Sequence, residues 1–152
     1  MTGLEDMCLS EYLSTVDCLI MGRKCMEVIS SFNLLLIHGL MVILLYSLSN
    51  SLKEEPDNLK DKIEMYSGDL NELVSKLEND GYNHAYIDGG TTIQAFINLQ
   101  LINEITITRA PILLGEGKPL FGKTFKDIKL TGAKAKVFPN DFIQVKYTID
   151  YT

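Results

Sequence analysis

The sequence predicts an α/β fold: a three-layer α/β/α sandwich around a mixed, mostly parallel central sheet, with a C-terminal antiparallel hairpin. Apolar strand-like runs alternate with helix-like segments through roughly the first 100 residues, which is typical of parallel crossover units. Two of the runs end in glycine turns, and the last two flank a Pro-Asn-Asp turn that favours a hairpin. The chain has 152 residues, of which 46% are hydrophobic, so we expect a single domain over residues 1–152.

The first predicted strand is a short, β-rich apolar run at residues 16–21. It ends at Gly22-Arg23-Lys24, after which apolar residues recur at helical spacing, so we expect a strand, a tight turn and a helix. A nearly continuous apolar run follows at residues 34–48, and its end, residues 41–48, has the composition of a buried central strand. Residues 62–66 predict another short strand.

The clearest helix signal begins at Ser67-Gly68-Asp69. Apolar residues then recur on one face of a helix, which Gly81 closes. Residues 84–87 predict a compact strand that leads into the second glycine turn, Asp88-Gly89-Gly90-Thr91-Thr92. Helical spacing after this turn extends to Leu99, so the strand, turn and helix unit occurs a second time.

Three strands complete the expected fold. Residues 101–110 alternate in part between apolar and polar side chains and stop at Pro111. Residues 128–137 and 142–151 are two further strand-like runs, joined by Pro139-Asn140-Asp141. We expect these last two strands to form the antiparallel hairpin at the edge of the sheet.

Charge and cysteine content narrow the class of function. The formal net charge of −6 argues against a nucleic-acid partner, because such proteins concentrate Lys and Arg. Cys8, Cys18 and Cys25 lack metal-ligand spacing, and the N-terminus lacks a signal-peptide pattern, so we expect a cytoplasmic protein without a metal. The apolar run 34–48 is shorter than the roughly 20 residues of a membrane helix, which makes a membrane-anchored protein the weaker alternative.

The two glycine turns carry the strongest functional signal. Ligands of open α/β sheets bind beyond the carboxyl ends of the strands, where helix N-termini present unpaired N–H groups. Gly89-Gly90-Thr91-Thr92 offers close backbone approach and hydroxyl donors to a pyrophosphate, and Gly22-Arg23-Lys24 adds positive charge. Together they could hold two ends of one dinucleotide. The alternative is ordinary structure, with a threonine N-cap at one turn and solvated basic residues at the other.

No catalytic residue can be assigned from the pattern. His38 and His84 are the only two histidines, and neither has a neighbouring Cys, Ser or paired acid at a useful spacing. We therefore expect a structural role for both.

Four segments together resemble a known family. In order they read DCLIMGRK at residues 17–24, YIDGG at 86–90, LINEI at 101–105 and APILLGEGKPLF at 110–121. In residues, order and spacing they resemble the RibD C-terminal domain family of the dihydrofolate-reductase-like superfamily. Within that superfamily the resemblance is closest to the reductase domain of the riboflavin-biosynthesis deaminase-reductase.

The resemblance implies an NADPH-dependent oxidoreductase that transfers hydride to a small molecule of pyrimidine or pteridine type. The activity it most resembles is that of 5-amino-6-(5-phosphoribosylamino)uracil reductase in riboflavin biosynthesis. It places cofactor phosphates at the two glycine turns and the adenosine phosphate near the loop after residue 48. The cofactor-binding residues it implies are Gly22, Arg23, Lys24, Ser49, Asn50, Gly89, Gly90, Thr91 and Thr92.

Two segments depart from the family pattern. Family members open with an additional strand that lines the nicotinamide and the substrate, whereas only residues 1–15 precede the first strand here, so we expect this strand to be missing. Residues 33–45 stand where relatives have a Trp-Pro-Tyr-Gly-like loop. Two alternatives stay open: dihydrofolate-reductase-type activity, and a truncated, non-catalytic relative that binds a nucleotide and forms a homodimer through the uncovered sheet edge.

Overall fold

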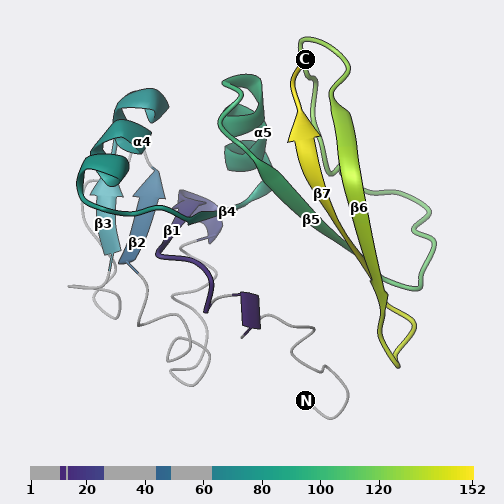
Figure 1. Ribbon diagram of the computed structural model, residues 1–152. Coiled ribbons are helices and arrows are strands. Elements are labelled where there is room, and N and C mark those ends of the chain that lie inside the picture. The colour runs from purple at the N-terminus through teal and green to yellow at the C-terminus, as the bar shows by residue number, and fades with distance from the viewer. Residues whose placement is uncertain (1–10, 13, 26–43, 49–62) are drawn as a thin grey trace. The chain divides into compact units, whose positions relative to one another are not determined.

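The computed structural model describes residues 11–12, 14–25, 44–48 and 63–152. These residues divide into two compact units, which lie within Cys8–Ile93 and Gln94–Thr152 (Figure 1). Both strands and helices are present, so the α/β class expected from the alternating pattern is confirmed. The single domain over residues 1–152 stays a prediction.

The first unit contains a parallel sheet of four strands (Figure 1). The strands are β1 (Cys18–Gly22), β2 (Leu44–Leu48), β3 (Ile63–Tyr66) and β4 (Ala85–Asp88). Their order across the sheet is β3-β2-β1-β4, and every pair of neighbours is parallel. The chain therefore adds β2 and β3 on one side of β1 and then crosses to the other side for β4.

Strand β1 forms the centre of this sheet because its sequence is apolar without interruption. Cys18, Leu19, Ile20 and Met21 each expose no more than 1% of their surface. A parallel strand with neighbours on both sides is covered on both faces, which favours a continuous apolar run over an alternating one. The strand predicted at residues 16–21 is thus confirmed, although it starts two residues later, at Cys18, and ends one residue later, at Gly22.

Helix α4 (Leu70–Asn79) follows β3 and has the ends that the sequence predicts. The side chain of Asp69 caps it by accepting hydrogen bonds from the amides of Asn71 (2.8 Å) and Glu72 (3.2 Å). Leu73 and Leu77, one helical turn apart, are buried. The φ of +91° at Gly81 lets the chain turn away after the helix.

The second unit contains an antiparallel sheet (Figure 1). Its strands are β5 (Glu104–Arg109), β6 (Lys129–Val137) and β7 (Ile143–Asp150), in the order β5-β7-β6. The amide of Phe138 bonds to the carbonyl of Phe142 at 2.9 Å, and Asp141 has a φ of +65°, so the predicted turn closes the β6–β7 hairpin. Whereas we expected one mixed sheet, the described strands form two sheets, one parallel and one antiparallel.

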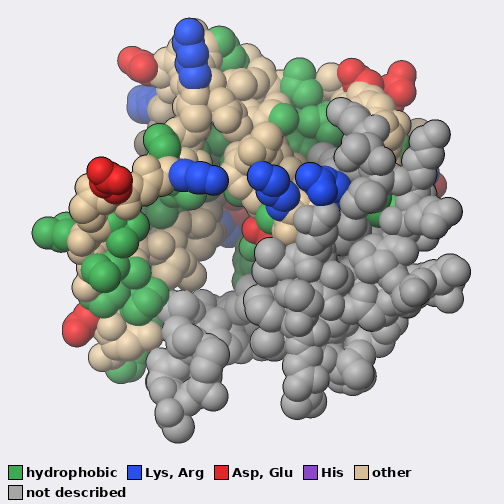
Figure 2. Space-filling view, turned by 180° about the vertical axis from the view of Figure 1, so that it is seen from behind, with side chains coloured by type: hydrophobic (Ala, Val, Ile, Leu, Met, Phe, Trp, Pro, Cys, Tyr) green, Lys and Arg blue, Asp and Glu red, His purple; other side chains and the backbone are tan. Residues whose placement is uncertain are grey.

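The long connection between β5 and β6 contributes little to the core of its unit. Exposed apolar side chains are visible on this unit in Figure 2, and several belong to the connection. Leu113, for example, exposes 88% of its surface. The large apolar residues exposed in the connection are Ile112, Leu113, Leu114, Leu120, Phe121 and Phe125.

Several sequence predictions fall outside the described residues. They are the rest of the helix after Gly22, the early part of the apolar run 34–48, and both departures from the family pattern, residues 1–15 in large part and 33–43. The three layers of the sandwich and the missing first strand therefore stay predictions. Within the described ranges, no helix combines the length and the apolar character that crossing a membrane requires.

The carboxylate of Asp17 ties the start of β1 to the start of β4. Its Oδ2 accepts hydrogen bonds from the amides of Asn83 (2.7 Å) and His84 (3.1 Å). We expect Asp17→Ala to lower the free energy of unfolding by about 1–2 kcal/mol, because it leaves both amides without this acceptor. Urea unfolding should show the loss, and Glu78→Ala, at an exposed carboxylate of α4, should change stability by less. Equal losses in the two variants would contradict the anchoring role.

Alkaline pH is expected to weaken the core through Cys18. Burial, and then the charge of Asp17, raise the pKa of its thiol from 9.0 to about 11. Between these two values the unfolded chain loses the proton while the folded chain keeps it, so the stabilisation is full below the lower value and is lost as pH rises through the upper one. The loss amounts to roughly 2–3 kcal/mol.

Urea unfolding of the wild type and of Cys18→Ala across this pH window isolates the contribution. The stability difference between the two proteins should shrink as the pH rises, because only the wild type carries the thiol. A difference that stays constant would show that Cys18 does not titrate as proposed.

Candidate functional site

The two glycine turns lie next to each other at one edge of the parallel sheet. Strands β1 and β4 are hydrogen-bonded neighbours, and Met21 pairs with Asp88. Gly22 and Gly89 follow these partners, so both turns leave the sheet at the same level. A Cβ built on Gly89 would lie 4.0 Å from the amide nitrogen of Gly22. The structure thus brings together the two segments that the sequence analysis selected separately.

The order in which the chain adds strands to the sheet also reverses at this edge. From β1 the chain proceeds through β2 to β3 on one side, and β4 then pairs with the opposite side of β1. In open α/β sheets such a reversal creates the crevice in which ligands bind, beyond the carboxyl ends of the two strands.

Gly89 has a conformation and surroundings that only glycine satisfies. Its φ is +95°, outside the range that L side chains readily adopt. A Cβ at this position would lie 2.8 Å from the Sγ of Cys25, which is closer than non-bonded atoms approach. The turn after β4 is therefore built to bring bare backbone close to the turn after β1.

Thr92 supplies a buried hydroxyl at the same place. Its side chain is 8% exposed, and its Oγ1 lies 3.0 Å from the position of a Cβ on Gly22. In the part of the chain that the structure describes, this hydroxyl has no hydrogen-bond partner. A buried polar group without a partner is destabilising by about 1–3 kcal/mol, so its presence calls for an explanation such as a functional role or a bound ion or water.

Helix α5 (Gly90–Asn98) begins immediately after the second turn. Its first intrahelical bond runs from the amide of Ile93 to the carbonyl of Gly89 at 2.8 Å. The amides of Gly90, Thr91 and Thr92 therefore have no acceptor within the helix, and the helix dipole adds a partial positive charge there. Gly90 and Thr91 are exposed, so their amides can reach an external anion.

Asp88 limits what this turn can bind. Its Oδ1 accepts a hydrogen bond from the amide of Gly89 at 2.9 Å, so that amide is already occupied. An anion must then approach from the side of the α5 amides and of the Thr92 hydroxyl, away from the Asp88 carboxylate. Sequence reasoning gave Asp88 no role of its own, although its place between the strand and the glycines is typical of a residue that shapes a turn.

The basic residues of the first turn lie at the same edge. Residues 23–25 are helical, with Arg23 half-buried and Lys24 exposed. Leu48, the last residue of β2, pairs with Gly22, so β2 also ends at this edge. Ser49 and Asn50, the two predicted cofactor contacts that follow β2, lie outside the described residues.

Cys25 is a residue of this site that the sequence analysis did not select. Burial raises the pKa of its thiol, the charge of Asp88 raises it further, and a backbone hydrogen bond from Gly22 acts in the opposite direction. The thiol is therefore mainly protonated at neutral pH. The sequence does carry a signal for this position. Cys25 follows Gly22 by three residues, and residues three apart lie on the same face of a helix.

His84 has structural contacts, as expected from the sequence. Its Nδ1 lies 2.6 Å from the carbonyl oxygen of Thr15, at the amino end of β4 and thus opposite to the glycine turns. The neighbouring Tyr86 packs edge-on against Tyr12, with ring centroids 5.2 Å apart. His38 lies outside the described residues.

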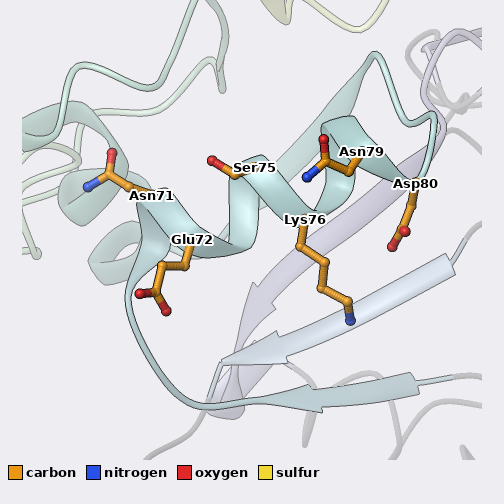
Figure 3. A pocket seen from close by; sticks show the side chains of 6 residues that line it. All are labelled: Asn71, Glu72, Ser75, Lys76, Asn79 and Asp80. Carbon is orange, nitrogen blue, oxygen red and sulfur yellow. The ribbon is translucent and has the colours of Figure 1, made fainter.

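A hollow of the first unit lies along α4 (Figure 3). Its lining consists of Asn71, Glu72, Ser75, Lys76, Asn79 and Asp80. The Nζ of Lys76 reaches back to the Oε1 of Glu64 on β3, at 2.6 Å. Because this helix and its cap supply the whole lining, we regard the hollow as a solvated polar face and assign no function to it.

Comparison with known proteins supports the relationship that the sequence motifs indicate. The family described as RibD C-terminal domain matches residues 31–144. A curated relative, the uncharacterized protein YyaP of Bacillus subtilis (strain 168), is 25% identical over 154 aligned residues, covering 93% of this chain and 79% of YyaP.

Two solved structures are similar over nearly the whole chain. A candidate riboflavin biosynthesis protein from Shewanella sp. PV-4 has 33% identity and a TM-score of 0.88, covering 99% of this chain and 83% of that one. A pyrimidine reductase-like protein from Corynebacterium diphtheriae has 16% identity and a TM-score of 0.75, covering 95% and 80%. At that lower identity only the fold is shown. The family match and the Shewanella relative together establish that this chain belongs to the RibD C-terminal domain family.

Proposed function

We propose that this chain is an NADPH-dependent reductase that transfers hydride to a pyrimidine-type intermediate of riboflavin biosynthesis. The substrate in this proposal is 5-amino-6-(5-phosphoribosylamino)uracil, whose ring-opened sugar would be reduced to a ribityl group. Family membership supports a reductase-like enzyme of riboflavin biosynthesis. The cofactor and the particular reaction are our inference.

The observation that carries the proposal is the adjacency of the two glycine turns at the point where the strand order reverses. A dinucleotide has two phosphates joined at its centre, and it needs bare backbone and unpaired N–H groups at that point. Because Gly89 has no side chain, a phosphate can approach the backbone closely there, and the first turn of α5 supplies the N–H donors. The buried hydroxyl of Thr92 supplies one donor that nothing else in the described chain uses.

The residues present therefore fit a nicotinamide dinucleotide. When bound, this cofactor would supply the hydride. The chain itself would hold the diphosphate on the amides of Gly90, Thr91 and Thr92, while Arg23 and Lys24 would add charge in a protein that is otherwise acidic. Ser49 and Asn50 are proposed near the adenosine phosphate. Fixing the cofactor in one orientation converts a bimolecular encounter into an oriented reaction. No proton donor is assigned.

A coupled assay tests the reaction itself. The purified chain is mixed with NADPH and the phosphoribosylamino-pyrimidine, and loss of the nicotinamide absorbance is followed together with the mass of the product. The proposal predicts substrate-dependent NADPH oxidation and a product two hydrogens heavier. Oxidation with dihydrofolate in place of the pyrimidine would replace the proposed substrate, and NADPH binding without oxidation of either would indicate a non-catalytic relative.

Arg23→Ala is expected to weaken NADPH binding by about tenfold, because one charge-assisted contact to phosphate is lost. The dissociation constant of the variant should also depend less on salt concentration, since fewer counterions are displaced on binding. Lys129→Ala, at an exposed lysine of β6, is the matched control for loss of one positive charge. Equal weakening by both variants would mean that only net charge matters and would remove Arg23 from the site.

The setting of the activity is part of the proposal. We propose a cytoplasmic enzyme that acts on a small molecule, without nucleic-acid, membrane or metal partners, and that assembles as a homodimer. Light scattering of the purified chain should give the mass of two chains at concentrations used for assay. A mass of one chain that retains full activity would contradict the dimer.

A further inference from the structure

The sulfur of Cys25 lies beside the second glycine turn. Its Sγ is 2.8 Å from the position of a Cβ on Gly89, and the same position is 3.8 Å from the Oγ1 of Thr92 and 4.0 Å from the amide nitrogen of Gly22. The backbone of Gly22 also acts on the thiol, whose pKa it lowers. The sulfur thus borders the backbone of both turns at once. The thiol is partly exposed, so a small reagent has access to it.

Thr92 shows independently that this space is built for a ligand. The residue is 8% exposed, its Oγ1 lies 3.0 Å and 3.8 Å from the Cβ positions of Gly22 and Gly89, and this hydroxyl has no partner in the described part of the chain. Folding alone would favour valine at such a position, because valine has the same shape without a polar group to satisfy. A hydroxyl here is explained by an acceptor that arrives from outside, such as a phosphate oxygen.

We propose that Cys25 is a modification site that controls the nucleotide cradle, by which we mean the two turns at Gly22 and at residues 89–92. An adduct on the Cys25 sulfur and a nucleotide diphosphate bound in the cradle exclude each other. The inference rests on the proposed nucleotide-binding function and adds a thiol-dependent regulation of that same site. Any adduct adds at least one heavy atom to a sulfur that already lies 2.8 Å from the position a Cβ on Gly89 would take. Since the backbone cannot retreat without breaking the β1–β4 pairing, the adduct must extend into the ligand's space.

The co-reactant is a low-molecular-weight disulfide of the kind present in cells under oxidising stress. The thiolate of Cys25 attacks one sulfur of that disulfide, a new S–S bond forms, and the old S–S bond breaks. The other half leaves as a thiolate and takes up the proton that Cys25 released. Cys25 is thereby oxidised and one half of the disulfide is reduced. A dithiol reverses the reaction by the same exchange, so the block is temporary.

Two features of the site set the rate of this reaction. Burial and the Asp88 charge keep Cys25 mainly protonated at neutral pH, so exchange should be slow there and accelerate as the pH rises. Cys18 provides an internal comparison, because it is fully buried in β1 and should react only when the chain unfolds. A bound nucleotide should protect Cys25 by occupying the space through which the reagent must approach.

Methyl methanethiosulfonate is the probe, because it attaches a small methylthio group and releases methanesulfinate. The rate of modification at each cysteine is followed by peptide mass, with and without NADPH. At a concentration of about ten times its dissociation constant, NADPH leaves about a tenth of the sites free, so modification of Cys25 should slow about tenfold. In the converse experiment, the dissociation constant of the modified chain for NADPH should rise by about tenfold or more, and a dithiol should restore binding.

Cys25→Ser separates this site from the other thiols. The variant keeps Cys8 and Cys18, so NADPH binding by the variant is compared with and without the reagent. The inference expects no difference between those two titrations. A reagent-induced loss of binding in the variant would assign the effect to Cys8 or Cys18 and overturn the inference.

The outcomes also separate the inference from the proposed function. If the unmodified chain binds NADPH, but methylthiolation of Cys25 leaves its affinity unchanged or NADPH gives no protection, the regulation is overturned and the nucleotide site stands. If the unmodified, folded chain does not bind NADPH, both are overturned. Protection together with reversible loss of binding supports both.

Discussion

Replacing Gly89 with alanine is expected to weaken NADPH binding by about tenfold or more and to lower the free energy of unfolding by about 1–3 kcal/mol. The stability loss follows from a φ of +95°, which alanine adopts only with strain. The binding loss follows from the new Cβ, which would meet the Sγ of Cys25 at 2.8 Å and displace that side chain beside the two turns. NADPH titration and urea unfolding of the same preparation measure both effects.

Gly81→Ala is the matched control for this experiment. Gly81 has a nearly equal φ of +91°, but no atom lies within 4 Å of its Cβ position. Alanine there should lower stability by a similar amount, about 1–3 kcal/mol, and leave NADPH binding unchanged. If Gly81→Ala weakened binding as much as Gly89→Ala, the binding loss would reflect general instability and the close approach of the two turns would have no special role.

Removing the sulfur provides a second check on the same contact. In the double variant Gly89→Ala/Cys25→Ala, the added Cβ no longer meets Sγ, so part of the lost stability should return. We expect a coupling between the two substitutions of about 1 kcal/mol or more, as is typical of residues in direct contact. Strictly additive effects would show that the two side chains do not compete for the same space.

Thr92→Val should separate the effect on ligand binding from the effect on folding. Valine has the same shape as threonine without the hydroxyl, so the buried polar group with no partner in the described structure disappears. We expect the free energy of unfolding to stay the same or to rise by about 1 kcal/mol. Binding of NADPH should weaken by about tenfold or more, because a hydrogen bond to a charged group is lost.

Thr92→Ser tests whether the hydroxyl is the group responsible. Serine retains the oxygen and removes only a methyl group, so NADPH binding should stay close to that of the wild type while stability falls slightly. Thermal unfolding in the absence of ligand and NADPH titration are measured on all three proteins. A Thr92→Val protein that loses stability but binds NADPH normally would show that the hydroxyl stabilises the fold. Thr92 would then have no role as a donor to the nucleotide.

The elements that the sequence predicted well are those whose signals are local. Helix α4 has a capping aspartate, an apolar stripe and a closing glycine within one short stretch, and its observed bounds agree with all three. Strand β1 is recognisable because it is apolar throughout, and the glycine turn fixes its end. Each of these signals acts over a few residues, so no knowledge of distant contacts is needed.

The pairing of the strands depends on contacts between distant residues, and here the prediction was less complete. We expected one mixed sheet, whereas the described strands form a parallel and an antiparallel sheet. Residues 101–110 were predicted as one strand, but Gln100 has a φ of +58° and the amide of Leu101 still bonds to the carbonyl of Phe96. The turn that follows α5 (Gly90–Asn98) thus extends to the first of these residues, and β5 starts only at Glu104.

The candidate site, like the fold, could be predicted from the sequence only where the signals are local. Both glycine turns were selected from their residues, because glycines before a helix have a recognisable purpose. That they lie side by side follows only from the pairing of β1 with β4. Thr92 was selected as a hydroxyl donor from its place at the turn, but its burial without a partner in the described chain depends on tertiary contacts. The position of Cys25 beside Gly89 depends on such contacts too, and the sequence analysis did not select it.

The measurement that tests the central claim most directly is a titration of the purified chain with NADPH, with nicotinamide fluorescence and the thermal midpoint followed together. The account predicts saturable binding that raises the midpoint, with weaker binding for Gly89→Ala and Thr92→Val and unchanged binding for Gly81→Ala. A chain that unfolds cooperatively but shows neither a fluorescence change nor a shift of the midpoint would contradict the claim that its two glycine turns form a nucleotide cradle.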